Sequence, residues 1–415
     1  MNLKEKIPND YKDIINKITK AASLGGYTVY AVGGFVRDMV MNRIPNDLDI
    51  MVEKENGGIE FSKFLSKGLK ISEPVIFERF GTAKLSIDGR EIEFIMPRKE
   101  YYDENSRNPD TEIGSLMQDA LRRDFTVNAL FLRLNDMELV DLLNKGLKDI
   151  ENKIIRVTDS SAADIIFSQD PLRILRAVRQ SCQLGFKIEE QTYASMKKNA
   201  FRIKIVSPER IRDEINKMLE CQNVSQTFKM LDELNLLEFI FPTIEKEKFV
   251  RYFFEKLPEN NKTAVILAFL LGKKSDKILT GLKYPKDFIK TIVSVSEGYE
   301  YLKEHNAELT DSQIRKFEKR YRNVLPVIAD LCFLSDKKRF DVLFKKINEM
   351  SLKNELIPER EMFSGEELMA IFKKPSGKWI AETKIYVEDL LCDNPKITKE
   401  ETLKEIKLRL KKQSL

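Results

Sequence analysis

Two aspartates separated by one residue, Asp47 and Asp49, are the side chains whose spacing first suggests chemistry. They lie in the segment PNDLDI at residues 45–50. In a strand, alternate side chains point to the same face, so both carboxylates would lie on one face, about 7 Å apart. Two like charges this close repel unless a positive charge lies between them. The pair therefore predicts a site for a divalent cation.

Two glycines and an arginine precede these aspartates in the segment VGGFVRD, residues 32–38. Gly33 and Gly34 stand between an expected strand and an expected helix, where they let backbone N–H groups approach a phosphate closely. Arg37, one turn into that helix, would hold the same anion. With the aspartates, these residues predict a nucleoside triphosphate bridged by Mg²⁺ to the carboxylates. The alternative is a tight turn followed by two exposed aspartates.

A second charged cluster stands in DALRRDFTVNAL, residues 119–130. Arg122, Arg123 and Asp124 come directly before an expected strand. An arginine can pair with phosphate oxygens through two hydrogen bonds, and an aspartate can accept from ribose hydroxyls. Taken alone, the segment favours a simpler interpretation, a surface charge cluster that caps the strand.

A third cluster stands in QDPLRILRAVR, residues 169–179. Asp170 followed by proline is typical of a helix start, with the aspartate as N-cap, so Asp170 by itself needs no function. Arg173, Arg176 and Arg179 then recur every third residue among apolar side chains. Burying part of such a stripe without partners is costly. The stripe therefore predicts an anionic ligand or the edge of a base as its partner.

The elements that must position these residues change in type near residue 150. Before it, the pattern predicts strands at 27–32 and 48–53, a helix from 35, a β-hairpin at 80–97, and strands within 126–134 and 138–143. After it, amphipathic helical segments follow one another, at 170–186, 190–200, 208–220, 224–235 and onward to the end. The chain is therefore predicted to be an α/β head followed by an all-helical body.

Composition narrows the classes of function. The chain has 415 residues, 33% of them charged, and a net charge of +5, which permits a nucleic-acid partner without requiring one. A single histidine, His305, nearly excludes histidine-based metal sites and Ser-His-Asp triads. The four cysteines form no CxxC pair and are interpreted as free thiols of a reducing compartment. With no signal-like N-terminus and no apolar run of 18 residues, a cytoplasmic protein without a membrane partner is expected.

The order GGxVRD, DxD, RRDFTxNA and DPLRxLRAxR resembles the class II branch of the tRNA nucleotidyltransferase and poly(A) polymerase family, strongly over residues 1–220 and more weakly beyond. The resemblance implies an α+β fold, with a polymerase-β-like nucleotidyltransferase head containing a mixed sheet, then a helical neck, body and tail. The corresponding divisions are 1–150, 151–235, 236–325 and 326–415. The family adds nucleotides to an RNA 3′ end without a nucleic-acid template. Two metal ions, expected to be Mg²⁺, would promote attack of the RNA 3′-hydroxyl on the α-phosphorus.

The resemblance also implies roles for individual residues. Asp47 and Asp49 would be the catalytic metal ligands. Asp124 would lie near the ribose, and Asp170 and Arg173 would hydrogen-bond to the base and select C and A. The matching nucleotide-binding positions are Gly34, Arg37, Arg123, Asp124, Asp170, Arg173, Arg176 and Arg179. Glu93 falls where some members have a further carboxylate.

Three activities of the family compete: CCA addition, A-only or CC-only addition, and poly(A) synthesis. Residues 98–110, RKEYYDENSRNPD, resemble the flexible loop needed for the terminal A, and no arginine-rich GRRF-type segment precedes the hairpin. Residues 363–391 resemble the tail of bacterial CCA-adding enzymes, with Glu367 in place of an aspartate. Gln169 and Gln180 depart from the usual pattern around Asp170.

These features favour CCA addition to tRNA from CTP and ATP, with no protein partner required. The alternatives are an A-adding enzyme that works with a separate CC-adding enzyme, a poly(A) polymerase, or a catalytically silent RNA-binding protein on the same fold.

Overall fold

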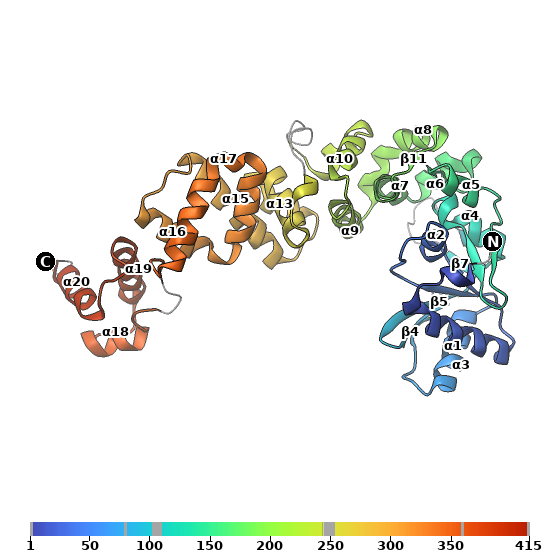
Figure 1. The fold of residues 1–415 in the computed structure, drawn as a ribbon, viewed down its shortest axis with the longest axis horizontal. Coiled ribbons are helices and arrows are strands. Elements are labelled where there is room, and N and C mark those ends of the chain that lie inside the picture. The colour runs from blue at the N-terminus through green and yellow to red at the C-terminus, as the bar shows by residue number, and fades with distance from the viewer. Residues whose placement is uncertain are drawn as a thin grey trace. The chain divides into compact units, whose positions relative to one another are not determined.

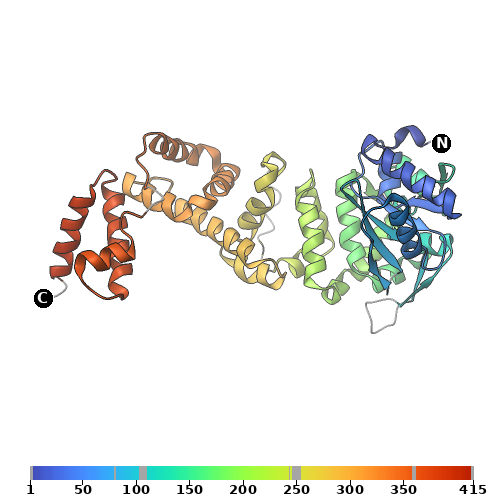
Figure 2. The ribbon, with the colours of Figure 1, turned by 90° about the horizontal axis from the view of Figure 1, so that it is seen from below.

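The computed structural model describes residues 3–78, 81–101, 110–242, 244, 254–357 and 361–412. Its contacts divide the chain into two compact units, Met1–Ile240 and Phe241–Leu415. The strands are confined to the first unit, and the second unit is helical throughout the residues described (Figures 1 and 2). The expected order of a mixed-sheet head followed by helices is confirmed, whereas the four-part division stays a prediction.

The first unit is built on a seven-stranded mixed sheet. Its strand order is β3 (Val75–Phe77), β4 (Thr82–Ile87), β5 (Arg90–Ile95), β2 (Asp49–Val52), β1 (Val29–Val32), β8 (Phe131–Arg133) and β9 (Glu138–Val140). All neighbouring strands pair antiparallel except β2 and β5, which are parallel. The parallel pair sets Asp49 directly opposite Glu93, so the register of one strand pair brings two carboxylates to the same level of the sheet.

Both faces of the sheet centre are covered. Helices α1 (Asn9–Gly25) and α3 (Gly57–Leu69) pack on one face, against residues such as Ala31 and Ile50. Helix α4 (Leu116–Arg122) contributes to the apolar cluster on the other face, with Tyr30 and Val32. Alternate residues of β1 pack into the apolar clusters on the two faces of the sheet, so the strand is buried along its whole length.

The hairpin predicted at 80–97 is formed by β4 and β5. Asp88 and Gly89 connect the strands with positive φ angles of 51° and 78°, the backbone conformation that suits a two-residue hairpin turn. A separate ribbon pairs β6 (Arg98–Tyr101) with β7 (Asp110–Ile113). Its connection, residues 102–109, which carries most of the predicted flexible loop, lies outside the described residues, as do Arg79 and Phe80.

Helices follow the sheet to the end of the first unit. They are α2 (Gly34–Val40) within the sheet region, then α5 (Gly146–Glu151), α6 (Ala163–Gln169), α7 (Leu172–Leu184), α8 (Glu190–Asn199), α9 (Pro208–Leu219), α10 (Val224–Glu233) and α11 (Leu237–Ile240). Helix α7 packs against both α9 and α10. Two short strands that the sequence pattern did not indicate, β10 (Ile154–Ile155) and β11 (Lys187–Ile188), pair in parallel.

The second unit contains α13 (Glu259–Leu271), α14 (Ser275–Gly281), α15 (Lys286–Glu304), α16 (Asp311–Tyr321), α17 (Leu325–Leu352), α18 (Gly365–Phe372), α19 (Lys378–Asp393) and α20 (Lys399–Lys412). Ser364 and Glu367 form a reciprocal capping box at the start of α18, which gives the glutamate at this position a structural role. Trp379 donates to the carbonyl oxygen of Pro375 at 2.9 Å. Among the helices described here, none has the length and apolar character that crossing a bilayer would require.

Candidate active site

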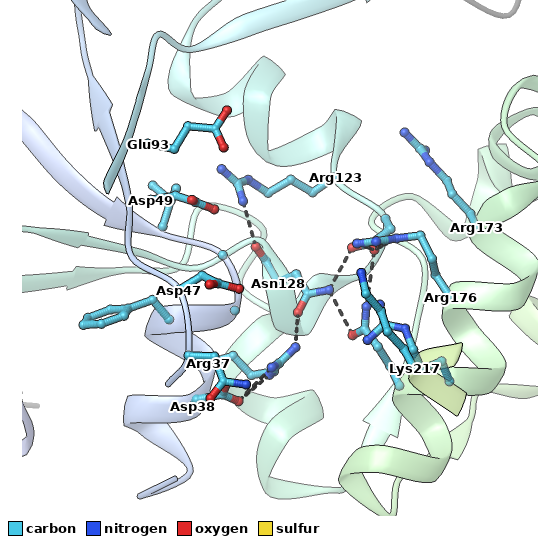
Figure 3. A pocket seen from close by; sticks show the side chains of 18 of the residues that line it. Arg37, Asp38, Asp47, Asp49, Glu93, Arg123, Asn128, Arg173, Arg176 and Lys217 are labelled. Carbon is cyan, nitrogen blue, oxygen red and sulfur yellow. Dashed lines mark hydrogen bonds and ion pairs between the residues drawn. The ribbon is translucent and has the colours of Figure 1, made fainter. Parts of the chain in front are cut away.

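All ten residues that the sequence predicted for metal or nucleotide binding line one pocket of the first unit, with a volume of about 1000 Å³ (Figure 3). Glu93 lines it too. One wall consists of the sheet and α2, and the other consists of α7 and α9. The fold therefore brings together three segments that lie far apart in the sequence, around residues 34–49, 123–124 and 170–179.

The carboxylates lie at the edge of the pocket formed by β2 and β5. The sequence predicted that both aspartates lie in a strand, but β2 begins at Asp49, and Asp47 precedes it in an exposed, irregular segment. Both side chains nevertheless line the pocket. Burial, together with the charges of Glu93 and Asp47, raises the pKa of Asp49 to about 6, although Arg123 opposes the shift.

This environment fits a divalent cation, because a positive ion would relieve the mutual repulsion that raises the pKa of Asp49. Within the described residues, no group of three His, Cys, Asp or Glu side chains forms a metal site by itself. Mg²⁺ is commonly held by one or two carboxylates together with water and substrate phosphates, so two aspartates beside a phosphate pocket are a sufficient protein contribution.

The glycine turn leaves space for the arginines beside it. Gly33 has φ 72° and ψ −136°, a conformation that a side chain would strain. A Cβ atom at this position would also lie 3.1 Å from a terminal nitrogen of Arg123. Arg37 donates to Asp38 and to the side-chain oxygen of Asn128, both at 2.8 Å. The turn thus places a glycine backbone between two guanidinium groups.

A fully buried carboxylate holds the arginines of the RRD segment. Asp119 is 0% exposed and accepts hydrogen bonds from Nε of Arg122 at 2.8 Å and from Nε of Arg123 at 3.0 Å. It also accepts from the backbone N–H of Arg98, the first residue of β6, at 3.4 Å. The sequence analysis did not single out Asp119, although its i,i+3 and i,i+4 spacing to the two arginines was visible in DALRRD.

Asp124 lies at the centre of a buried network that joins the two walls. It accepts from Nε of Arg176 at 2.8 Å, from Asn128 at 2.8 Å and from Gln180 at 3.3 Å. Burial acts to raise the pKa of Asp124, but the positive charge of Arg176 and hydrogen bonds from Asn128 and Arg176 outweigh it. The pKa is consequently held well below its ordinary value.

The arginine stripe of α7 has partners within the protein. Besides Asp124, Arg176 lies 3.6 Å from a carboxylate oxygen of Glu214, and Arg179 donates to Glu214 at 2.6 Å. The expectation that an external anion or base satisfies the whole stripe is therefore wrong for these two side chains. Arg173 is different, because its guanidinium donates to the backbone carbonyl of Arg122 at 2.7 Å and no carboxylate pairs with it among the described residues.

The start of α7 also differs from the expectation. Pro171 occupies the N-cap position of α7, and Asp170 is the residue that follows α6. The aspartate side chain therefore does not cap α7. Its carboxylate instead accepts from Arg210 of α9 at 3.3 Å. This leaves Asp170 and Arg173 facing the pocket from the beginning of α7.

Several further polar residues of the site were not predicted from the sequence, among them Asp119, Asn128, Arg210, Glu214 and Lys217. It noted Gln180 as a departure, and the structure gives the reason for an amide there. Its side-chain oxygen accepts from Asn128 at 3.0 Å while its nitrogen donates to Asp124. An apolar side chain would leave both groups short of a partner.

Family models match three consecutive parts of the chain. A model described as the poly A polymerase head domain matches residues 29–156. The RNA- and SrmB-binding site of polymerase A matches residues 185–248, and tRNA nucleotidyltransferase domain 2 matches residues 256–405. The first model covers the sheet and the segments that carry the aspartates and the RRD arginines.

Individual relatives agree with these models. The CCA-adding enzyme of Bacillus pumilus (strain SAFR-032) is 29% identical over 395 residues, which is 92% of each chain. The tRNA nucleotidyltransferase cca2 of Schizosaccharomyces pombe is 32% identical over 269 residues, and the match spans 60% of this chain and 55% of that protein.

Solved structures are also similar over nearly the whole chain. A CCA-adding enzyme in complex with ATP has a TM-score of 0.72 and 26% identity, with 98% of this chain and 97% of that chain covered. The Thermotoga maritima CCA-adding enzyme complexed with tRNA has a TM-score of 0.69 and 25% identity, with the same coverage. The Bacillus stearothermophilus CCA-adding enzyme in complex with CTP, 20% identical with a TM-score of 0.77, supports the fold.

Proposed function

This chain belongs to the tRNA nucleotidyltransferase family, of the CCA-adding type, and from that premise we propose that it adds C, C and A to the 3′ end of tRNA from CTP and ATP. The observation that carries the proposal is that one pocket is lined both by the aspartate pair of the head and by Asp170 and Arg173, at the beginning of α7. One wall can thus hold phosphates and metal while the other contacts the base. The reaction needs no nucleic-acid template if the base is selected by these side chains.

Nucleotidyltransferases with this polymerase-β-like head generally use divalent metals. In this chain Asp47 and Asp49 would hold Mg²⁺, with Glu93 beside them on β5. When bound, Mg²⁺ stabilises negative charge on the phosphate oxygens and favours deprotonation of the attacking hydroxyl. The raised pKa of Asp49 supports this assignment, because the site is unfavourable for a lone carboxylate charge and favourable for one paired with a cation.

The chain's own residues would orient the nucleotide. Arg37 and Arg123 present guanidinium groups on either side of the glycine turn, where they would bind phosphate oxygens. Asp119 fixes Arg123, so little side-chain freedom remains to be lost when the phosphate binds. Asp124 would lie beside the ribose and orient Asn128 and Arg176, which it already binds.

Base selection would rest on complementary hydrogen bonding. Cytosine and adenine both carry an exocyclic amino group where uracil and guanine carry a carbonyl oxygen. The carboxylate of Asp170 accepts from an amino group and repels a carbonyl oxygen, and Arg173 can donate to a ring nitrogen or oxygen. In the free protein Asp170 accepts from Arg210, so a bound base would compete with this pair or share the carboxylate with it.

The proposal is tested by incorporation assays with Mg²⁺, CTP and ATP on three tRNAs, which end before CCA, in CC, and in complete CCA. We expect the first to gain C, C and A and then stop. Extension of the CC-ending tRNA alone would indicate an A-adding enzyme, and open-ended A tails would indicate a poly(A) polymerase.

The same assay tests the metal-binding aspartates. Asp47→Ala should abolish incorporation and leave tRNA binding nearly unchanged, because Asp47 is exposed and its removal disturbs no buried contact. Asp13→Ala is the matched control, since Asp13 is an exposed aspartate on α1 away from the pocket. Normal turnover by Asp47→Ala would remove the aspartate pair from the mechanism.

A further inference from the structure

One face of α9 carries three charged side chains, Arg210, Glu214 and Lys217. Their spacing of i, i+4 and i+7 places them on the same side of the helix. Arg210 and Lys217 line the pocket, and Glu214 is buried against α7. The face toward the pocket is thus a charged row rather than an apolar one.

The first two members of the row have partners on α7 or just before it. Arg210 pairs with Asp170, and Glu214 pairs with Arg176 and Arg179. Lys217 is exposed, and among the described residues its ammonium group has neither a carboxylate within ion-pair distance nor a hydrogen-bond partner. It is a lysine that lines the active pocket with its charge unmatched.

The pairs between the helices show which end of the pocket Lys217 occupies. Asp170, just before α7, pairs with Arg210 near the start of α9, and Arg179, farther along α7, pairs with Glu214, farther along α9. The two helices therefore run side by side in the same direction. Lys217 lies about 10 Å along the helix axis from Arg210, and Gln183, which follows Arg179 by about one turn of α7, lines the same pocket. The head contacts α7 at this end of the pocket, because Arg43 donates to the backbone carbonyl of Gln183 at 3.1 Å.

Asp170 and Lys217 therefore mark opposite ends of the wall formed by α7 and α9. Figure 3 shows Lys217 in front of Arg176 and toward Arg37, away from Arg173. Because Asp170 and Arg173 would receive the base, the end near Lys217 would receive the phosphates. At that end the charges of Arg37 and Arg179 are matched by Asp38 and Glu214.

We propose that Lys217 binds the terminal phosphates of the incoming nucleotide. This inference rests on the proposed function of the same pocket. A lysine suits the role because its ammonium is a compact charge with three donors on a flexible stem, which can follow phosphates that no single rigid geometry fixes. The proposal makes α9 a phosphate-binding element, in addition to the glycine turn and arginines of the head.

The test compares Lys217→Met with Lys217→Arg in the full-length protein. The matched control is Lys197→Met, since Lys197 is an exposed lysine of α8 outside the pocket. Equilibrium binding is measured for CTP, inorganic tripolyphosphate, CMP and tRNA. We expect Lys217→Met to weaken CTP and tripolyphosphate binding by about five- to tenfold, as loss of one charge-assisted contact would. CMP and tRNA binding should not change, and Lys217→Arg should stay close to the wild-type protein.

Unchanged CTP and tripolyphosphate binding in Lys217→Met would overturn the inference. A loss confined to tRNA would also overturn it, because it would identify Lys217 as an RNA contact. Failure of the proposed function is distinguishable: if the wild-type protein extends no tRNA while tripolyphosphate binding still depends on Lys217, the phosphate site stands and the proposed reaction is wrong.

Discussion

Replacing Asp49 by asparagine should stabilise the metal-free protein while it removes nucleotide incorporation. The pKa of Asp49 is about 6 in the folded protein, against an ordinary value of 3.8, because of burial and the neighbouring Glu93. A difference of about two pKa units corresponds to about 3 kcal/mol of destabilisation when the carboxylate is ionised. Asparagine keeps the shape of the side chain without the charge, so the free energy of unfolding should rise by an amount of this order at pH 8.

The pH dependence follows from the sign of the shift. Asp49 has a raised pKa, so its ionisation is less favourable in the folded state than in the unfolded state. The stability difference between Asp49→Asn and the wild-type protein should be near zero below pH 4. It should grow between pH 4 and pH 6 and be constant above pH 7. Titrating groups away from Asp49 cancel, because they are common to both proteins, and the repulsion from Glu93 and Asp47 is already part of the shift of Asp49.

Amide hydrogen exchange of β1 and β2 in EDTA measures the free energy of opening where Asp49 lies, with Asp13→Asn as the control for an exposed aspartate. Added Mg²⁺ should slow exchange in the wild-type protein more than in Asp49→Asn. The reasoning is refuted if Asp49→Asn is no more stable than the wild-type protein at pH 8, or if any gain persists unchanged at pH 4.

Two further predictions concern the arginines around the pocket. Arg176→Met should lower the free energy of unfolding by about 3 kcal/mol, because it leaves the carboxylate of Asp124 buried without its ion pair. The deficit should shrink as the pH falls below about 4, since the low pKa of Asp124 contributes stability above that range. Denaturant unfolding measures it, and a loss no larger than that of the surface-pair variant Lys198→Met would contradict the prediction. Asp119→Asn should raise KM for CTP by about tenfold, as expected if Arg123, which loses a charged hydrogen-bond partner, binds phosphate as proposed. KM for tRNA should not change, and an equal change in both constants would indicate general damage to the fold.

Local features of the first unit could be predicted from the sequence, because each depends on residues that are adjacent in the chain. The presence of the hairpin and of the helix after Gly34 follows from backbone preferences over a few residues, whereas the structure shows which residues form the turn, Asp88 and Gly89. The start of β2 was predicted too early, because strand ends depend on which residues find a partner, and Asp47 lies before the pairing with β5. The short strands β10 and β11 were not predicted, because a strand of two residues shows no alternating pattern in the sequence.

The sequence predicted which residues gather in the pocket but not how they pair with one another. A DxD pair, a glycine turn and an RRD segment indicate metal and phosphate chemistry, because those functions need particular side chains at short spacing. The sequence did not show which arginines pair with carboxylates of the protein and which remain free to bind a ligand. Arg176 meets Asp124 across 52 residues and Arg179 meets Glu214 across 35 residues, and no short segment contains both partners.

The sequence by itself therefore predicted the type of reaction, the candidate residues for it and the change from a mixed-sheet head to helices, and the structure confirms this last change. The tertiary structure decided that Asp49 faces Glu93, that Asp119 fixes Arg123, and that two arginines of α7 are neutralised by carboxylates while Lys217 is left unmatched. The physical reason is that these contacts depend on strand register and on how α7 packs against α9. Both are selected by the burial of many apolar side chains together, and residue spacing within any one segment does not encode them.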